Sequence, residues 1–419
     1  MVDTLRRDRL GCYGGPRPTS PNLDRLAAES TRFARATSQA PWTTPSIAAI
    51  LSSQYPTVLG IHDDACALRD DVLLLPEVVA ARGFATGAVV SHSFCSSKWH
   101  FDQGFQSFDE SNVKGHQAVT SAGVTDRALD FVREHVDAPF FLWVHYFDPH
   151  FAYVAHPEWE FTHAPDYAGP IESGMKFKEL LKLRRRMTPA DVDQLLRLYD
   201  SEIAHTDREI GRLLDGVRAL GLWDRSIVVF TADHGEEFLD HGGLGHTHTL
   251  YSELVHVPLI VKLPGRPAAV DERPVGGVDV MPTILDALRI DLPDGLVGRS
   301  LLEAEPDGAD LLRPIFSATE TPLGEKLAAV TMGPLKLVRD LNDGAQKLFD
   351  AVADPNEKRD LAAGAANDPA LAPKLAAMAR ALDLWLAECA AKERAAPKVE
   401  MSEEERKRLE ALGYGNSKR

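Results

Sequence analysis

Residues 226–236 read Ser-Ile-Val-Val-Phe-Thr-Ala-Asp-His-Gly-Glu, an apolar run that ends in polar and charged side chains. A continuous run without alternation is typical of a strand buried on both faces of a sheet. Apolar side chains at helical spacing over 203–220 stop before Gly221, a common residue at helix ends. Further runs of the same kind as 226–232 lie at 85–90, 140–145 and 257–262. We therefore predict an α/β fold with a large, mostly parallel sheet sandwiched by helices.

The pattern changes after about residue 312. A helical stretch over 373–391 and a charged segment over 402–412 lie near the end of the chain. Short strand candidates, separated by Gly-Pro and Asn-Asp-Gly turns, lie at 326–331, 335–339 and 346–349. We predict two units, a catalytic domain over 1–312 and a smaller C-terminal α+β subdomain with an antiparallel sheet over 313–419.

Composition limits the partners of the protein. The 419 residues carry 46 Lys and Arg against 62 Asp and Glu, a formal net charge of −16. This balance disfavours a general attraction to nucleic acid, so we predict no nucleic-acid partner. No run reaches the roughly 18 apolar residues that span a bilayer, so we predict no membrane insertion. The four cysteines form no Cys-x-x-Cys pair, which argues against a structural zinc site.

The first residues, Met1-Val-Asp-Thr4, read like the end of a buried strand and its loop. Strands usually need about five or six residues, so we expect an upstream segment that completes this one. Such a segment could carry an export signal. We therefore predict a soluble protein whose localisation is left open, and export is possible if this segment exists. The oligomeric state is also left open.

Polar side chains follow the predicted strands at the edge where ligands gather in parallel sheets. Asp3 follows the first strand, His150 comes soon after another, and Asp233 with His234 follow a third. A carboxylate and an imidazole side by side can both reach a divalent cation, and Gly235 permits a close backbone turn. Alternatively, Asp233 caps a helix beside an exposed histidine, and the tripeptide alone favours neither interpretation.

The stretch Pro41-Trp-Thr-Thr-Pro-Ser46 reads as a turn that leads into a helix. Pro45 suits the first helical position and Thr44 suits the cap. A hydroxyl at a helix amino end lies in a positive field that stabilises an alkoxide and an incoming anionic ester. The competing interpretation is that Thr43 and Thr44 only satisfy backbone N–H groups, and taken alone it is favoured by about two to one.

A series of motifs runs in order over nearly the whole chain. It comprises Asp3-Thr-Leu-Arg-Arg-Asp-Arg-Leu-Gly-Cys-Tyr-Gly14, Thr43-x-Pro-Ser46, Phe147-Asp-Pro-His150, Thr231-Ala-Asp-His-Gly-Glu236, Gly245-His246 with Leu250-Tyr-x-Glu253 and Val257-Pro258, Asp279-Val-Met-Pro-Thr283, and Leu348-Phe-Asp350 with Asp354-Pro-Asn-Glu357. The series resembles the sulfatase family of the alkaline-phosphatase superfamily. The resemblance implies an alkaline-phosphatase-like catalytic domain, a smaller C-terminal domain and one divalent metal ion.

The resemblance also implies residue roles. Asp3, Asp233 and His234 match the family's metal ligands, and Thr43 stands where the family's metal-bound nucleophile does. His246 is similar to the histidine that contacts the ester or protonates the leaving oxygen. Two further matches are His150, in the loop that lines the pocket, and Lys98, in a stretch where Ser97 replaces the usual glycine.

Three departures from the family pattern bear on the mechanism. Thr43 replaces the Cys or Ser that is oxidised to formylglycine, and Ile47 replaces the arginine of that motif. Thr4 replaces the second residue of an Asp-Asp pair, which leaves one fewer anionic ligand. We therefore expect no formylglycine. For the cation we expect Ca²⁺, with Mn²⁺, Mg²⁺ or Zn²⁺ as alternatives.

The leading hypothesis is a metal-dependent hydrolase of sulfate or phosphate esters, phosphodiesters included, with Thr43 as a metal-bound nucleophile. The expected partner is a small anionic ester whose identity the sequence leaves open. One alternative is a transferase that moves a phosphoryl-alcohol group to an acceptor hydroxyl. Another is a catalytically silent, sulfatase-like binding protein, which the residues at positions 43 and 47 would favour.

Overall fold

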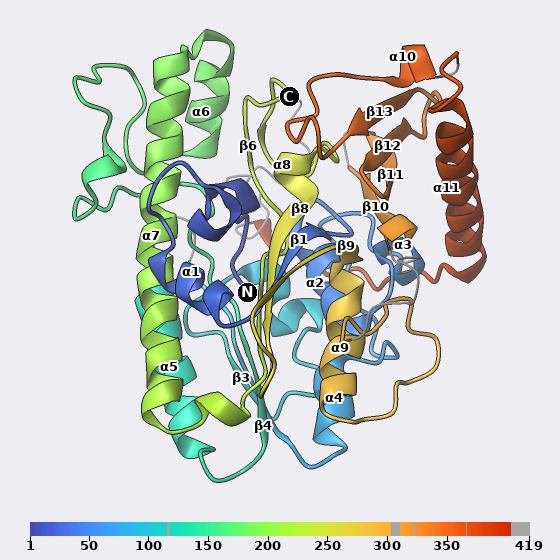
Figure 1. The fold of residues 1–419 in the computed structure, drawn as a ribbon. Coiled ribbons are helices and arrows are strands. Elements are labelled where there is room, and N and C mark those ends of the chain that lie inside the picture. The colour runs from blue at the N-terminus through green and yellow to red at the C-terminus, as the bar shows by residue number, and fades with distance from the viewer. Residues whose placement is uncertain (115–117, 303–310, 322–323, 366, 404–419) are drawn as a thin grey trace.

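The protein is described by a computed structural model over residues 1–114, 118–302, 311–321, 324–365 and 367–403. Its centre is formed by two sheets that are joined through Val2 (Figure 1). The first, in the order β3-β2-β4, is parallel and consists of β3 (Ser107–Asp109), β2 (Ala85–Val89) and β4 (Phe140–Val144). The second, in the order β5-β8-β1-β9, consists of β5 (Val228–Thr231), β8 (His256–Lys262), β1 (Thr31–Thr37) and β9 (Ala269–Gly276).

Only β8 runs against its neighbours in this arrangement. Val2 bridges in parallel to Tyr146, just beyond β4, and to Ala232, just beyond β5. One face is covered by α1 (Pro21–Ala28), α5 (Ser121–Glu134) and α7 (Pro189–Ala219), and the other by α2 (Thr43–Ser52), α4 (Leu75–Ala80) and α9 (Val280–Ala287) (Figure 1). The predicted mostly parallel sheet between helical layers is therefore confirmed.

Local sequence explains the longest helix, α7. Pro189 occupies its first turn, where a missing N–H costs nothing, and the Thr188 hydroxyl accepts a hydrogen bond from the Asp191 amide. The Asp191 carboxylate accepts one from the Thr188 amide in return. Gly221, with a φ of 70°, follows the end of the helix. Shorter helices are α3 (Pro56–Leu59), α6 (Phe177–Leu183) and α8 (Ser252–Val255).

The C-terminal part forms the expected α+β unit. Its antiparallel sheet comprises β10 (Ile315–Glu320), β11 (Lys326–Met332), β12 (Leu335–Asp340) and β13 (Gln346–Asp350) in sequence order. Two helices follow, α10 (Ala362–Ala365) and α11 (Ala372–Lys392). The rings of Phe316 and Trp385 stack with centres 4.9 Å apart in a separate apolar cluster. The boundary after residue 312 stays a prediction, and most of the charged segment 402–412 lies outside the described residues.

The start of α2 corrects one detail of the sequence analysis. The helix begins at Thr43 after an extended Trp42, so Thr44 is not the cap and Pro45 is not the first helical residue. Pro45 is still tolerated because no N–H of the first turn has a partner within the helix. The Thr44 hydroxyl instead donates to the carbonyl oxygen of Phe94, at 3.1 Å.

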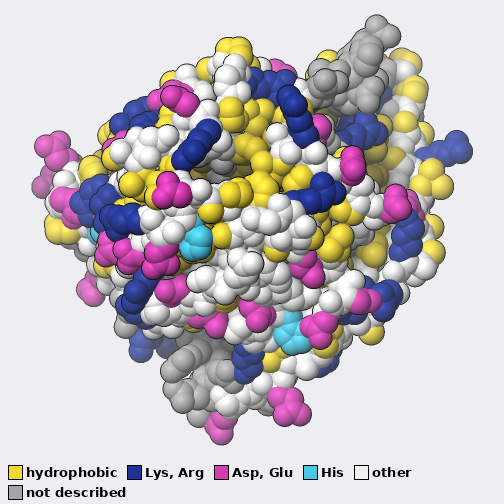
Figure 2. Space-filling model, turned by 90° about the horizontal axis from the view of Figure 1, so that it is seen from below, with side chains coloured by type: hydrophobic (Ala, Val, Ile, Leu, Met, Phe, Trp, Pro, Cys, Tyr) yellow, Lys and Arg dark blue, Asp and Glu magenta, His cyan; other side chains and the backbone are white. Residues whose placement is uncertain are grey.

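An apolar cavity of about 670 Å³ extends along β4 and β5, from Val144 and Thr231 to the amino ends of both strands at Phe140 and Val228. Leu142, Ile210 and Val229 are among its lining residues. Figure 2 looks onto this end of the molecule, where hydrophobic side chains gather around a hollow. None of the predicted site residues lines this cavity, so the predicted chemistry belongs to another part of the fold. No helix among the described residues is long and apolar enough to cross a membrane.

Candidate active site

The pairing of Val2 brings distant parts of the chain together. Asp3 donates its backbone N–H to the carbonyl oxygen of Tyr146 at 2.9 Å, and the Thr4 N–H donates to Oδ1 of Asp233 at 3.2 Å. The first loop therefore lies between the carboxyl ends of β4 and β5. Asp3, Asp233 and His234 are all fully buried there, as the sequence analysis expected for one site.

The ligand atoms of these residues have the spacing of a single cation site. Nε2 of His234 lies 3.7 Å from Oδ1 of Asp3, 3.5 Å from Oδ2 of Asp233 and 3.4 Å from Oγ1 of Thr43. Atoms that share one ion at about 2.0–2.5 Å lie roughly 3–5 Å apart. Nδ1 of His234 lies 2.9 Å from the Gly235 carbonyl oxygen and must donate to it, so Nε2 keeps its lone pair for a metal.

Three of the four carboxylate oxygens of Asp3 and Asp233 lack a hydrogen-bond partner among the described residues, namely both oxygens of Asp3 and Oδ2 of Asp233. Burial raises the pKa of Asp3 well above its usual range, and the nearby Asp233 carboxylate raises it further. Burial also raises the pKa of Asp233. A bound cation would satisfy the three carboxylate oxygens that lack donors, so these residues fit a divalent metal.

Thr43 is positioned by the start of α2. It is the first residue of the helix and is fully buried, so its hydroxyl lies at the positive end of ten helical residues. Ser46, one turn later, donates from its hydroxyl to the carbonyl oxygen of Asp233 at 2.6 Å. This bond ties the helix to the strand end that carries the metal-ligand candidates.

His246 lies beside His234, with ring centres 4.6 Å apart. Its Nδ1 shares a hydrogen bond of 2.9 Å with Oε1 of Glu236, and the Tyr153 hydroxyl donates to Oε2 of the same carboxylate at 3.1 Å. Burial, followed by the effect of nearby His234, lowers the pKa of His246 well below its usual value. The side chain is therefore oriented by Glu236, with Nε2 on the opposite edge of the ring.

The structure also locates the two remaining predicted residues. The His150 ring lies 5.1 Å from that of His246 and stacks on Phe147 at 4.7 Å, which places it beside the cluster. Lys98 lies in the 3-10 helix η4 (Ser97–Trp99), with its ammonium group 5.8 Å from the centre of the Trp99 ring. A role of Lys98 in substrate binding stays a prediction.

Sequence reasoning missed His145 and understated Glu236. His145 was included in a strand run, yet it follows β4 at the same edge where Asp233 follows β5, which was the available signal. His205, a further histidine on α7, stacks its ring on that of His156, with centres 4.2 Å apart.

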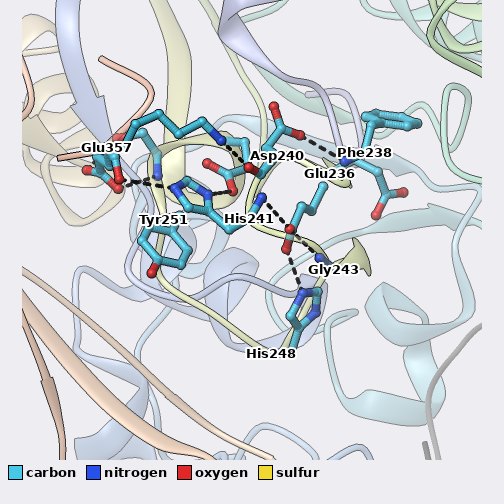
Figure 3. A network of polar contacts seen from close by, with 12 residues as sticks. Glu236, Phe238, Asp240, His241, Gly243, His248, Tyr251 and Glu357 are labelled. Atoms are coloured by element: carbon cyan, nitrogen blue, oxygen red, sulfur yellow. Dashed lines mark hydrogen bonds and ion pairs between the residues drawn. The ribbon is translucent and has the colours of Figure 1, made fainter. Parts of the chain in front are cut away.

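A polar network holds the loop that carries His246 (Figure 3). The Glu237 carboxylate accepts from the backbone N–H groups of His241 and Gly243, at 2.8 and 2.6 Å, and pairs with His248 at 2.7 Å. His241 also stacks on Tyr251, with ring centres 3.6 Å apart. These acidic and histidine side chains therefore hold the loop in place, and His248 also contacts the backbone oxygen of His246 through Nδ1, at 2.9 Å.

Comparisons with known proteins identify the family of the chain. The Sulfatase family matches residues 1–290 of the chain. An ulvan-active sulfatase of Formosa agariphila is 26% identical over 411 residues, covering 86% of this chain and 76% of that protein.

Two solved structures share the fold. The first is a protein in complex with its substrate, D-glucosamine-2-N,6-O-disulfate. Its TM-score is 0.77 at 20% identity, and the match covers 93% of this chain and 97% of that protein's chain. A phosphonate monoester hydrolase from Silicibacter pomeroyi has a TM-score of 0.71 at 22% identity, with 94% of each chain covered. The chain therefore belongs to the sulfatase family of the alkaline-phosphatase superfamily and is a sulfatase-like ester hydrolase.

Proposed function

We propose that the protein is a metal-dependent hydrolase of small anionic sulfate or phosphate esters, with Thr43 as its nucleophile. The observation that carries the proposal is the position of the Thr43 hydroxyl, 3.4 Å from Nε2 of His234 and at the amino end of α2. Asp3, Asp233 and His234, together with Thr43, would hold one divalent cation. When bound, the cation supplies positive charge that favours deprotonation of a hydroxyl and lowers the repulsion of an anionic ester.

The reaction divides into two displacements. In the first, Oγ1 of Thr43, having released its proton to solvent, forms a bond to sulfur or phosphorus while the bond to the alcohol oxygen breaks. His246 donates a proton to that oxygen, so the alcohol leaves neutral. In the second, a water molecule attacks the sulfur or phosphorus of the Thr43 ester, gives its proton back to His246, and releases the inorganic anion and Thr43.

The pair of His246 and Glu236 suits this proton transfer. When the two groups together hold two protons, one lies between Nδ1 and the carboxylate and the other lies on Nε2 of His246. Nε2 carries its proton whether the shared proton lies on Nδ1 or on the Glu236 carboxylate. His246 can therefore act as a donor to the leaving oxygen while Glu236 holds its ring in place.

Two classes of substrate fit the proposal, sulfate esters and phosphorus esters. Sulfated compounds are suggested by the names of the ulvan-active sulfatase and of the disulfate complex. A phosphorus ester is suggested by the phosphonate monoester hydrolase and by Thr43 itself. A sulfated threonine lacks the easy exit that formylglycine offers by hemiacetal collapse, so sulfate turnover would be slower.

The Thr43→Ala variant tests the proposal. We expect it to abolish hydrolysis across a panel of aryl sulfate, phosphate monoester, phosphate diester and phosphonate ester, each assayed with Mn²⁺, Mg²⁺, Ca²⁺ and Zn²⁺. Thr44→Val is the matched control, because it removes only the hydrogen bond to Phe94 and should cost about 1 kcal/mol of stability. Undiminished hydrolysis by Thr43→Ala would refute the proposal, and product analysis with added alcohols would reveal a transferase.

A further inference from the structure

His145 is a buried histidine that the proposed reaction does not use. It directly follows β4 and is fully buried. Within the described part of the chain, neither of its ring nitrogens has a hydrogen-bond partner. Leaving a polar group buried without a partner is costly, and most such groups in proteins are satisfied. An imidazole with two bare nitrogens therefore indicates that something binds there.

The neighbours of His145 indicate what binds. Nε2 of His145 lies 3.7 Å from Oδ2 of Asp3, too far for a hydrogen bond. His145, Asp3 and Asp233 each offer a ligand atom within 4.8 Å of the others. The Asp3 carboxylate is thus flanked on both sides, with His234 at 3.7 Å from Oδ1 and His145 at 3.7 Å from Oδ2. This spacing suits separate ligands of one ion.

Thr4 is the rival for the same role. Its hydroxyl is buried and lacks a partner among the residues that the structure describes, and it lies next to Asp3 in the chain. A neutral aliphatic hydroxyl is a weaker donor than an imidazole nitrogen for most divalent transition metals. His145 also places its Nε2 near Oδ2 of Asp3, whereas His234 lies near Oδ1 of the same carboxylate. The histidine is therefore the better candidate.

We propose that Nε2 of His145 is a further protein ligand of the cation, and that a site with two imidazoles takes Mn²⁺ or Zn²⁺ in preference to Ca²⁺. The inference rests on the proposed function, since it extends the same metal site. Ca²⁺ prefers a shell made of oxygen atoms, whereas imidazole suits the transition metals. The additional nitrogen narrows the choice of metal that the four other ligands leave open.

Nitrogen counting by pulsed electron paramagnetic resonance tests the inference. The full chain, labelled with ¹⁵N-histidine, is titrated with Mn²⁺ alone. We expect couplings from two histidine nitrogens in the wild type and from one in His145→Gln, with Mn²⁺ affinity at least about 10-fold weaker in the variant. His92→Gln is the matched control, because His92 is equally buried in the same region, and it should keep both couplings.

Each other outcome is decisive. A single coupling in the wild type that is lost in His234→Gln and kept in His145→Gln would overturn the inference and leave the metal site of the proposed function standing. Absence of Mn²⁺ binding by the wild type would overturn both. Displacement of Mn²⁺ by Ca²⁺ as readily as by Zn²⁺ would contradict the metal preference. The wild-type count needs no variant, so it holds even where His145→Gln fails to fold.

Discussion

At the scale of single residues, Glu236 is expected to support proton transfer by His246 and to take no part in metal binding. Its carboxylate contacts His246 and Tyr153 and is fully buried. In Glu236→Gln the amide cannot support a positively charged His246 ring as the carboxylate does. We expect turnover of esters with poor leaving groups to fall about 100-fold or more, and that of esters with good leaving groups to fall far less.

The effect is measured with a series of aryl esters whose leaving groups range from poor to good. In Glu236→Gln, kcat should depend more steeply on the quality of the leaving group than in the wild type. Glu237→Gln is the control, because Glu237 is similarly buried but pairs with His248 and holds the loop. It should lower stability and leave the slope of the series unchanged. An unchanged slope in Glu236→Gln would contradict the role given to His246.

Most of the cluster could be predicted at this scale, for a definite reason. Asp3, Asp233 and His234 directly follow buried strands, and parallel strands bring such positions to one edge. His145 obeys the same rule, but a histidine after five apolar residues reads as the last residue of the strand. Whether its nitrogens find partners depends on long-range packing, which the sequence does not contain.

At the scale of elements, the loop that carries Asp3 is tied to α7 by a buried ion pair. The Asp200 carboxylate is fully buried and accepts from Arg9, at 2.8 and 2.5 Å, and from Arg17 at 2.7 Å. Asp200→Asn would leave the buried Arg9 charge poorly compensated. We expect it to lower the free energy of unfolding by about 3 kcal/mol, measured by urea denaturation.

Asp193→Asn, about two turns earlier on α7, is the matched control. Asp193 also pairs with Arg17, at 2.5 Å, but its side chain is 42% exposed. An exposed pair contributes less than about 1 kcal/mol, so the control should change stability little. Equal effects of the two variants would show that the buried pair does not anchor the loop.

The contact between α7 and the preceding loop predicts a pH dependence of stability. Burial, then the neighbouring His205, lowers the pKa of His156 from 6.5 to about 4. The folded state thus favours the neutral ring, whereas the unfolded chain takes up the proton near pH 6.5. The stabilisation is present above pH 6.5 and is lost as the pH falls toward 4.

His156→Phe keeps an aromatic ring against His205 and removes this titration. We expect the free energy of unfolding to fall less between pH 7 and pH 5 in the variant than in the wild type, measured by urea denaturation at each pH. An equal fall in both proteins would mean that His156 does not contribute to acid lability.

The buried strands of the central sheet could be predicted because each is a continuous apolar run. Three strands escaped: β3 is only three residues long, and the other two have polar sequences. Residues 31–37 read Thr-Arg-Phe-Ala-Arg-Ala-Thr, and 269–276 include Asp, Glu and Arg. β9 lies at the edge of its sheet and its first residues are largely exposed, so no apolar run is required there.

At the scale of the whole molecule, the C-terminal unit contacts the loops that carry Thr43 and His246. The Ala318 N–H donates to the Gln39 carbonyl oxygen at 3.0 Å. Glu357 accepts from the Ser252 hydroxyl at 2.7 Å, and its backbone oxygen lies 3.1 Å from Nε2 of His241 (Figure 3). The sequence predicted two units but could not show that the second one braces the active site, because these contacts join residues far apart in the chain.

Lys336 gives a test of this bracing. Its ammonium group lies 2.9 Å from Oε1 of Glu357, and both side chains are buried. Lys336→Met would leave that carboxylate without its counter-charge. We expect a loss of about 3 kcal/mol and a lower kcat, because the loop attached to Glu357 becomes less ordered. Thermal unfolding and steady-state kinetics measure the two effects.

Lys326→Met serves as the control for Lys336→Met. Lys326 lies on the neighbouring strand β11 and pairs with Glu320, but both side chains are exposed. It should leave stability and kcat nearly unchanged. Loss of stability without any change in kcat in Lys336→Met would confine Glu357 to a purely structural role.

The central claim is that Thr43 becomes covalently attached to the group that is transferred. Rapid acid quenching during turnover of an aryl phosphate or aryl sulfate, followed by peptide mass spectrometry, tests it most directly. We expect a phosphorylated or sulfated threonine at position 43 that forms and decays at the rate of turnover. Turnover with an unmodified Thr43, or with the group attached to another residue, would contradict it.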